Sequence, residues 1–291
     1  MKWLLGVIGI AVAAALLVAA GGHLAEGAGY QYTSAATGRL VPASRLDTPL
    51  GVVTCERHRV MLSADGLTAT ELLRTADTVL SVMEAHPPGA ELPQLLVLTA
   101  EEMKAGRWWK SHLYLLSPDE PGEAKLLSPE SHYNFWDMSV GDVDGDGWEE
   151  VALCTYSCTA RDAEYAQRFF VYSWDEEGDL YPRWRGSRLC RPYVSAQLAD
   201  IVGDEKAELV SVEVGLNGGE MLVAYEWNQF GFWGLGHTRE YEEVRIVEAP
   251  GMTASGEKGV SAMLTFPNGR QEQAFLVVSD DRIDRMNAEI Q

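Results

Sequence analysis

Three aspartates stand at alternate positions of one short, glycine-rich segment, residues 140–153. They are Asp142, Asp144 and Asp146, and a further carboxylate follows at Glu150. Ca²⁺ takes about six to eight oxygen ligands at about 2.3–2.6 Å, so a short chain that binds it must curl tightly and aim alternate side chains inward. Two glycines inside the segment permit that curl, because glycine adopts positive φ at little cost. These residue types at this spacing predict a calcium-binding loop.

The ligand positions and the flanking residues indicate the kind of loop. With Asp142 as position 1, side-chain oxygens fall at positions 1, 3, 5 and 9, and the carbonyl of Trp148 is available at position 7. An EF-hand would require a Glu at position 12, where this chain has Leu153, and a helix on either side. The flanking segments 133–136 and 151–156 are instead aromatic and β-rich. We therefore expect the loop to join two strands.

The alternative is an acidic, solvated turn without metal. Three carboxylates on alternate positions repel one another unless a cation offsets them, which favours a bound cation. A weaker copy of the pattern has Asp200, Asp204 and Glu208 at positions 1, 5 and 9. It has Val202 at position 3 and Glu205 in place of the second glycine. We expect this copy to persist as a structural turn, with calcium binding as the open alternative.

The overall charge narrows the classes of partner. The chain has 291 residues, with 43 acidic residues against 23 Lys and Arg, and a formal net charge of −20. This balance argues against binding to nucleic acid or to an anionic membrane surface. It suits cations or basic partners, and it equally suits a secreted protein that needs only solubility.

The N-terminal segment predicts export. Lys2 is followed by 18 uncharged, mostly apolar residues, a length at the border between the core of a signal peptide and a membrane span. We expect residues 1–24 to be a signal peptide or signal anchor and residues 25–45 to be a tether. The protein would then be secreted, or anchored outside the cytoplasm by a single N-terminal transmembrane segment. Whether the leader is cleaved stays open.

Four cysteines, Cys55, Cys154, Cys158 and Cys190, allow three full pairings. Cys154 and Cys158 are too close in sequence to bridge within one extended strand. A bend between these two, or a bond between Cys158 and Cys190, stays open. A zinc site is not expected, because no His-rich partner accompanies the loose cysteine spacing.

A strand-and-turn signature recurs along the chain at steps of 51 to 58 residues. Each copy is an apolar or aromatic run that ends in turn-forming residues, as a strand does where it enters a hairpin. A period in this range indicates one repeated supersecondary unit. The copies begin at Val60, Tyr114, Tyr172, Tyr225 and Leu276. A further strand after the hairpin is expected at 123–127, 180–184 and 232–235.

Four strands per unit match the blade of a β-propeller, in which radial repetition protects the sheet edges. The predicted fold class is therefore all-β: a β-propeller of about five four-stranded blades, with four blades or an incomplete ring as alternatives. The propeller domain is expected at 46–291. The blades are predicted at 30–74, 75–130, 131–187, 188–240 and 241–291.

Two segments depart from the simple pattern. The last blade shows no evident fourth strand, because residues 284–290 are few and helix-like, so we expect an N-terminal strand near 40–42 to complete it and close the ring. Residues 68–85 contain good helix formers with apolar residues at i, i+4 spacing, so a helix competes with strands there.

Most other candidates for chemistry are explained by the repeat. His58 and His112 each stand two residues before a repeated strand start, and Trp174 and Trp227 stand two residues after one. We interpret all four as structural, with both tryptophans in inter-blade core or blade-face packing rather than in a sugar-binding platform. The unrepeated pair Trp108–Trp109, flanked by Lys104, Arg107 and Lys110, is a candidate contact surface, with a simple loop plug as the alternative. No nucleophile elbow, zinc-protease helix or phosphate-binding loop is present, which argues against an enzyme without excluding one.

The D-x-D-x-D-G-x-x-E pattern of 142–150, leading into a strand, resembles the FG-GAP/VCBS repeat, the blade unit of integrin-α-like β-propellers. In that family the loop joins the first two strands of a blade. The resemblance implies Ca²⁺ ligands at Asp142, Asp144, Asp146, the Trp148 carbonyl and Glu150. Proteins of this family commonly serve adhesion or recognition at the cell surface.

The resemblance thus implies an exported calcium-binding propeller that contacts a protein or glycan ligand at the cell surface, with Ca²⁺ in a structural role. Nucleic acid is not expected as a partner. Contact with the membrane is expected only through the N-terminal segment. One alternative is a carbohydrate-active enzyme of the polysaccharide lyase or glycosidase type on a propeller scaffold. It predicts a deep cleft near the ring axis with clustered Lys, Arg, Tyr and His, and a perturbed acid or base there would favour it. The other alternative is a purely structural domain.

Overall fold

The computed structural model describes residues 39–40, 45–64, 67–104, 107–127, 134–159, 162–186, 188–279 and 282–285. The expected leader, residues 1–24, and most of the expected tether lie outside these ranges. Within the ranges every regular element is a β-strand, and none of them contains a helix that could cross a membrane.

The strands form five antiparallel sheets, each with four strands that follow one another in sequence, and β1 adds a further strand to one of them. The first sheet consists of β2 (Arg45–Thr48), β3 (Gly51–Glu56), β4 (Arg59–Ser63) and β5 (Thr70–Arg74), and the second of β6 (Thr78–Ala85), β7 (Gln94–Lys104), β8 (Arg107–Leu116) and β9 (Ala124–Leu126). The third consists of β10 (Phe135–Gly141), β11 (Glu150–Thr159), β12 (Asp162–Trp174) and β13 (Leu180–Arg185), and the fourth of β14 (Tyr193–Ala199), β15 (Glu208–Val214), β16 (Glu220–Trp227) and β17 (Phe232–His237). The fifth consists of β18 (Glu243–Met252), β19 (Lys258–Thr265), β20 (Gln271–Ser279) and β21 (Arg282–Arg285).

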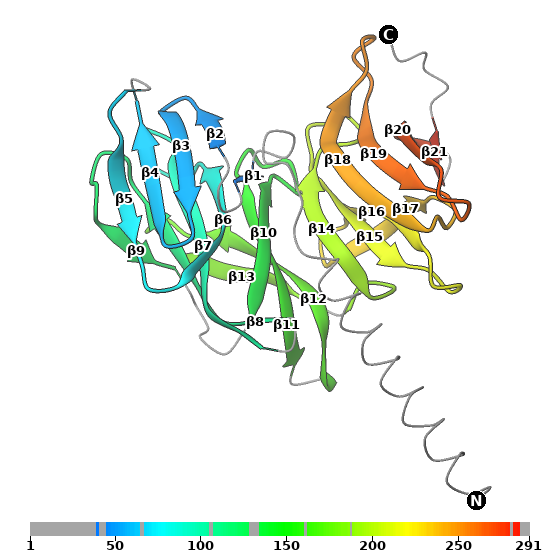
Figure 1. Ribbon diagram of the computed structural model, residues 1–291, viewed down its shortest axis with the longest axis horizontal. Coiled ribbons are helices and arrows are strands. Elements are labelled where there is room, and N and C mark those ends of the chain that lie inside the picture. The colour runs from blue at the N-terminus through cyan, green and yellow to red at the C-terminus, as the bar shows by residue number, and fades with distance from the viewer. Residues whose placement is uncertain are drawn as a thin grey trace, which may run out of the picture.

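This architecture is consistent with a five-bladed β-propeller and confirms the predicted fold class. The repeated strand starts lie on the third strand of every sheet, namely β4, β8, β12, β16 and β20. The three expected fourth strands are β9, β13 and β17. In Figure 1 the first sheet lies on the left, the fifth on the right and the third between them.

Two predictions about individual segments are wrong. The fifth sheet has its own fourth strand, β21, which pairs with β20 from Ser279 opposite Arg282 onward. The N-terminal strand, β1 (Arg39–Leu40), pairs instead with β6 and adds a fifth strand to the second sheet. The rest of the segment expected to be helix-like, 286–290, lies outside the described residues.

The helix that competed at 68–85 does not form. The segment contains β5 and β6, with a bend between them at 76–77. Its Thr and Val side chains are β-branched and suit a pleated strand. Along β6, Val79 and Val82 face the core shared with the first sheet, whereas Met83 and Ala85 face the next core. Tertiary packing on both faces of the sheet therefore overrides the helical spacing.

Four hydrophobic cores fill the seams between successive sheets, so the central strands are apolar on both faces. Strand β7 shows the pattern: Leu96 and Leu98 pack against the third sheet, whereas Leu95 and Val97 pack against the first. Each such side chain contributes about 1.5–3 kcal/mol when fully buried. This two-sided burial explains why the strands read as continuous apolar runs rather than as alternating ones.

The first strands of neighbouring sheets lie beside one another, since β10 packs against both β6 and β14. The loops that leave these strands therefore gather at one end of the ring. The predicted calcium loop and its weaker copy are two of these loops.

Candidate metal centre

The predicted calcium loop joins β10 to β11, the first two strands of the third sheet. The strand pair ends where Gly141 lies opposite Glu150, so residues 142–149 form the loop. Gly145 and Gly147 have φ of 76° and 89°, a region that glycine adopts without strain. The loop geometry is therefore the tight curl that the sequence predicted.

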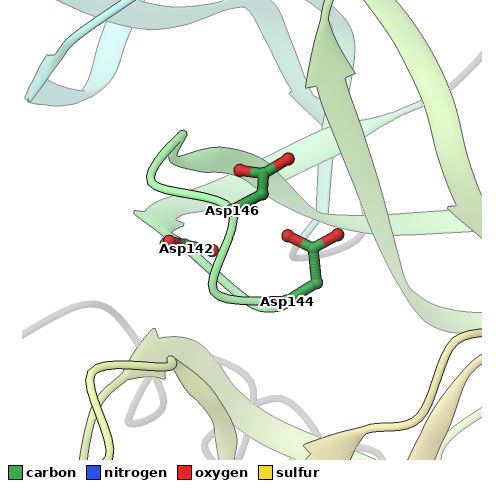
Figure 2. Close-up of side chains that lie close together, drawn as sticks. All are labelled: Asp142, Asp144 and Asp146. Atoms are coloured by element: carbon green, nitrogen blue, oxygen red, sulfur yellow. The ribbon is translucent and has the colours of Figure 1, made fainter.

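Hydrogen bonds inside the loop hold its carboxylates in place. Asp142 accepts bonds from the backbone N–H groups of Gly145 at 2.6 Å and Gly147 at 2.8 Å. Asp146 accepts one from the N–H of Trp148 at 2.8 Å. Carboxylate oxygens of Asp142, Asp144 and Asp146 lie within 4.8 Å of one another, and Figure 2 shows these three side chains on the loop. Such a cluster could hold a metal ion.

Glu150 belongs to the same loop but is turned toward the sheet. It is 2% exposed and accepts hydrogen bonds from the Val143 N–H at 3.1 Å and the Ser173 hydroxyl at 3.0 Å. Burial, reinforced by the charges of Asp146 and Asp142, raises the pKa of its carboxyl to about 7. Of the predicted ligands, the structure thus gathers the three aspartates, while Glu150 faces other partners.

A cation that no sequence pattern indicated lies beside the loop, namely Arg183 on the outer strand β13. Its guanidinium bonds to Asp144 and, through Nη1, to Glu150 Oε1 at 3.1 Å and to the Ser173 hydroxyl at 3.1 Å. No spacing rule connects residues 39 positions apart, so only the fold reveals this contact. The sequence marks Arg183 only as a basic residue within the predicted strand 180–184, between aromatic residues.

The donor set fits a divalent cation. One guanidinium faces three clustered aspartates, so negative charge remains in excess around the loop. The second carboxylate oxygen of Asp144, Oδ1, is buried without a hydrogen-bond partner. A buried carboxylate oxygen without a donor is costly, and a hard cation would satisfy it.

The weaker copy at 200–208 has the same backbone design. Asp200 accepts bonds from the N–H groups of Gly203 at 2.6 Å and Glu205 at 3.2 Å, and Glu208 accepts one from Ile201 at 2.9 Å. Glu205 adopts φ of 70° where the first loop has a glycine. Within the described part of the chain this loop forms no three-carboxylate cluster.

A protein cation also accompanies this second loop. The ammonium of Lys258, at the start of β19, lies 2.5 Å from Asp200 Oδ2. Val202, in the position of the missing ligand, is exposed. Here a lysine from the next sheet offsets the first aspartate of the loop.

The other sequence candidates are mostly structural. Trp174 is buried in the seam between the second and third sheets, and Trp227 packs against the next seam, as predicted. The pair Trp108–Trp109 lies on β8, at the far end of its hairpin with β7. All four cysteines are free, so neither of the bonds left open forms.

A pocket of about 430 Å³ opens beside both loops, between the second, third, fourth and fifth sheets. Its lining includes the apolar side chains of Met83, Val140 and Leu198, and its titratable lining residues are Glu84, His86, Asp142, Glu149, Asp200 and Glu205. His86 lies 3.6 Å from Glu84 and 3.2 Å from Glu149. The pocket lining is therefore mainly acidic, and among the described residues that line it His86 alone belongs to the Lys, Arg, Tyr and His set expected of a carbohydrate-active site.

Comparisons with known proteins add one distant structural likeness. No protein-family model matches the sequence, and no curated protein matches it. Among solved structures, the chain is similar to a protein titled "Bifunctional GH43-CE" from Bacteroides eggerthii, with 12% identity and a TM-score of 0.38. The match covers 87% of this chain and 36% of that one, so the chain spans about a third of that protein. The assignment of a propeller-like all-β fold therefore rests on the chain's own five sheets.

Proposed function

We propose that this chain is an exported calcium-binding β-propeller in which the ion has a structural role. The observation that carries the proposal is the aspartate cluster, with three carboxylates within 4.8 Å on a loop pre-shaped by its own hydrogen bonds. The three aspartates hold the ion together with the Trp148 carbonyl, by analogy with the FG-GAP/VCBS loop, while Glu150 keeps its bonds to Arg183 and Ser173. Binding to the folded state alone stabilises the fold by mass action.

Calorimetric titration of Ca²⁺ into the full chain, with thermal melts alongside, tests this proposal. We expect one site that raises the melting temperature and disappears in Asp144→Ala. The matched control is Asp204→Ala, which removes a carboxylate from the second loop and should leave the binding unchanged. No heat of binding at millimolar Ca²⁺ would remove the basis of the proposal.

The biological role that best suits such a module is recognition of a protein or glycan outside the cytoplasm. The candidate surface is the distal end of the β7–β8 hairpin. Met103 is half-exposed there, and the guanidinium of Arg107 lies 3.3 Å from the ring centre of Tyr156 on the third sheet. Because β7 runs away from the loop that follows β6, this end lies on the face opposite the metal loop.

Binding to a glycan array tests the recognition role. Trp108→Ala should abolish any signal that this hairpin carries. Trp233→Ala removes a tryptophan that is 64% exposed on β17, and it should leave the signal intact. Equal loss in both variants would point away from the hairpin.

A second candidate, a glycosidase-type enzyme, is favoured by one observation in the acidic pocket. Burial raises the pKa of Glu84, with Glu149 raising it further and His86 opposing. Glycosidases use a carboxyl of raised pKa as general acid beside a second, ionised carboxylate. Hydrolysis of an oligosaccharide panel by the wild type, lost in Glu84→Gln with Ca²⁺ binding unchanged, would establish this activity.

A further inference from the structure

The metal loop already contains a cation supplied by the protein itself. Arg183 bonds to Asp144 with one nitrogen and to Glu150 and Ser173 with another. Asp144 is the central aspartate of the cluster, and a carboxylate paired with a guanidinium is less available to a metal ion. Glu150 is almost fully buried, so the guanidinium keeps a strong partner even when it leaves Asp144.

The second loop shows how the same design behaves with a permanent protein cation. Its hydrogen bonds repeat those of the first loop, yet it has no central aspartate and its first aspartate is paired with Lys258. In the first loop the cation bonds instead to the central aspartate, Asp144, whose position in the second loop is occupied by Val202. In the second loop the lysine takes the place of a metal ion, whereas in the first loop the arginine competes with the ion for Asp144.

One further atom indicates that the first network is incomplete without a cation. Asp144 Oδ1 is buried without a hydrogen-bond partner, and the unpaired Nε of Arg183 shows that this pairing does not fully satisfy the guanidinium either. The Arg183 guanidinium also lies over the ring of Trp227 on the fourth sheet, 5.5 Å from its centre. A shift of this side chain would thus change its contact with Trp227 across the seam between the third and fourth sheets.

We infer that Arg183 is a built-in competitor of the metal ion: it releases Asp144 when the ion binds, lowers the affinity of the loop, and transmits occupancy to Trp227. This inference rests on the proposed calcium binding. It makes Arg183 the residue that sets the calcium concentration at which the loop fills, and it links filling to the packing between two blades.

The first test compares Ca²⁺ affinity in Arg183→Gln and Lys258→Gln by calorimetry. Both variants replace one positively charged side chain near an aspartate loop with a neutral one, so they change the net charge of the protein by the same amount. Arg183→Gln should bind about ten- to a hundredfold more tightly, because a neighbouring cation and a competing bond are both removed. Lys258→Gln should stay within about threefold of the wild type. A folded Arg183→Gln protein with unchanged or weaker affinity overturns the inference.

The second test uses the wild-type chain and does not depend on that variant folding. Tryptophan emission is recorded during Ca²⁺ titration of the wild type and of Trp227→Phe. We expect a change in the wild type that saturates with the calorimetric binding curve and is smaller in Trp227→Phe, where Trp148 of the loop itself still reports binding. Calcium binding without a Trp227-dependent change means that Arg183 does not move, and the inference fails.

The outcomes distinguish this inference from the proposal on which it rests. If neither wild type nor Arg183→Gln binds Ca²⁺, calcium binding itself is refuted. If only Arg183→Gln binds, the arginine blocks the loop, which is the inference in its strongest form. If both bind equally, the calcium site stands and the competition does not.

Discussion

The backbone N–H of Ala207 donates a hydrogen bond of 2.6 Å to the carbonyl of Asp142. Asp142 opens the first aspartate loop, and Ala207 ends the second one just before β15. The side chain of Lys206 continues this contact, because it lies against Gly145 of the first loop. The two loops thus form one continuous structure across the seam between the third and fourth sheets.

This seam leaves no room at Gly141, the last residue of β10. A Cβ added there would lie 2.7 Å from the Ala207 methyl and 3.1 Å from Leu198 Cβ. Gly141→Ala should therefore lower the free energy of unfolding by about 1–3 kcal/mol, because Cβ atoms are fixed to the backbone and cannot move aside. Gly234→Ala on β17 meets no atom within 4 Å and should change it by less than about 0.5 kcal/mol. Urea unfolding of both variants checks the difference, and equal costs would contradict the close approach.

Glu208 makes the stability depend on pH. Burial, with help from the charges of Asp204 and Asp200, raises the pKa of its carboxyl to about 7. The folded state therefore holds the proton more tightly than the unfolded state. The associated stability is fully present below about pH 4.5 and is lost as the pH rises through about 7.

Glu208→Gln should remove this contribution, because its amide oxygen can still accept the Ile201 N–H bond without carrying a charge. At pH 8 the variant should be more stable than the wild type by on the order of 2–3 kcal/mol, and at pH 4.5 the difference should vanish. Denaturant unfolding at the two pH values measures it. A constant difference between them would show that the carboxyl does not titrate as stated.

Arg168 holds the long β11–β12 hairpin from inside. It is 1% exposed and donates hydrogen bonds to the Ser157 carbonyl at 3.0 Å and to Asp162 at 2.9 Å. Arg168→Met should cost about 2–3 kcal/mol, because the buried carbonyl loses its donor. Arg188 bonds to the same Asp162 from a side chain that is 40% exposed, so Arg188→Met should cost less than about 1 kcal/mol. Hydrogen exchange should rise at 157–159 and 162–166 in the first variant only.

The four thiols should differ sharply in reactivity under native conditions. Cys190 is exposed, whereas Cys55 and Cys154 are buried. Burial, followed by the charge of Glu56, raises the pKa of Cys55 to about 12, which lowers its thiolate population near neutral pH on the order of a thousandfold. Alkylation followed by mass spectrometry should modify Cys190 first and Cys55 only after unfolding. An unreactive Cys190 together with a mass lower by two hydrogens would instead reveal a bond to Cys158.

The sequence predicted those features that depend on local pattern. Apolar runs ending in turn residues located the third strand of every sheet, from Val60 to Leu276, because hairpins form between neighbours in the chain. The aspartate spacing located the loop, and the glycines at 145 and 147 indicated its curl. The last blade was mispredicted because β21 is short and polar, so its pairing with β20 leaves little pattern to read.

The features that the sequence could not supply are contacts between distant strands. Arg183 reaches Asp144 from the outer strand of the same sheet, and Lys258 reaches Asp200 from the next sheet. Each basic residue is ordinary in its local context and becomes part of a loop only through the strand register. Glu150 likewise has a suitable position in the sequence, but its side chain faces Ser173 in the sheet rather than the aspartate cluster.

Each of the five sheets contains four strands in sequence order, with β1 as an added strand in the second, and this has a consequence for how the chain folds. Nearly all strand pairs join neighbours in sequence, so the entropy of closing long loops is small for an all-β protein of this size. A blade can complete its hydrogen bonds as soon as its own residues have emerged from the ribosome, before the next blade is made. The two-residue pairing of β1 with β6 joins segments that flank the whole first sheet in sequence. This pairing therefore cannot form until the first sheet and β6 have both been synthesised.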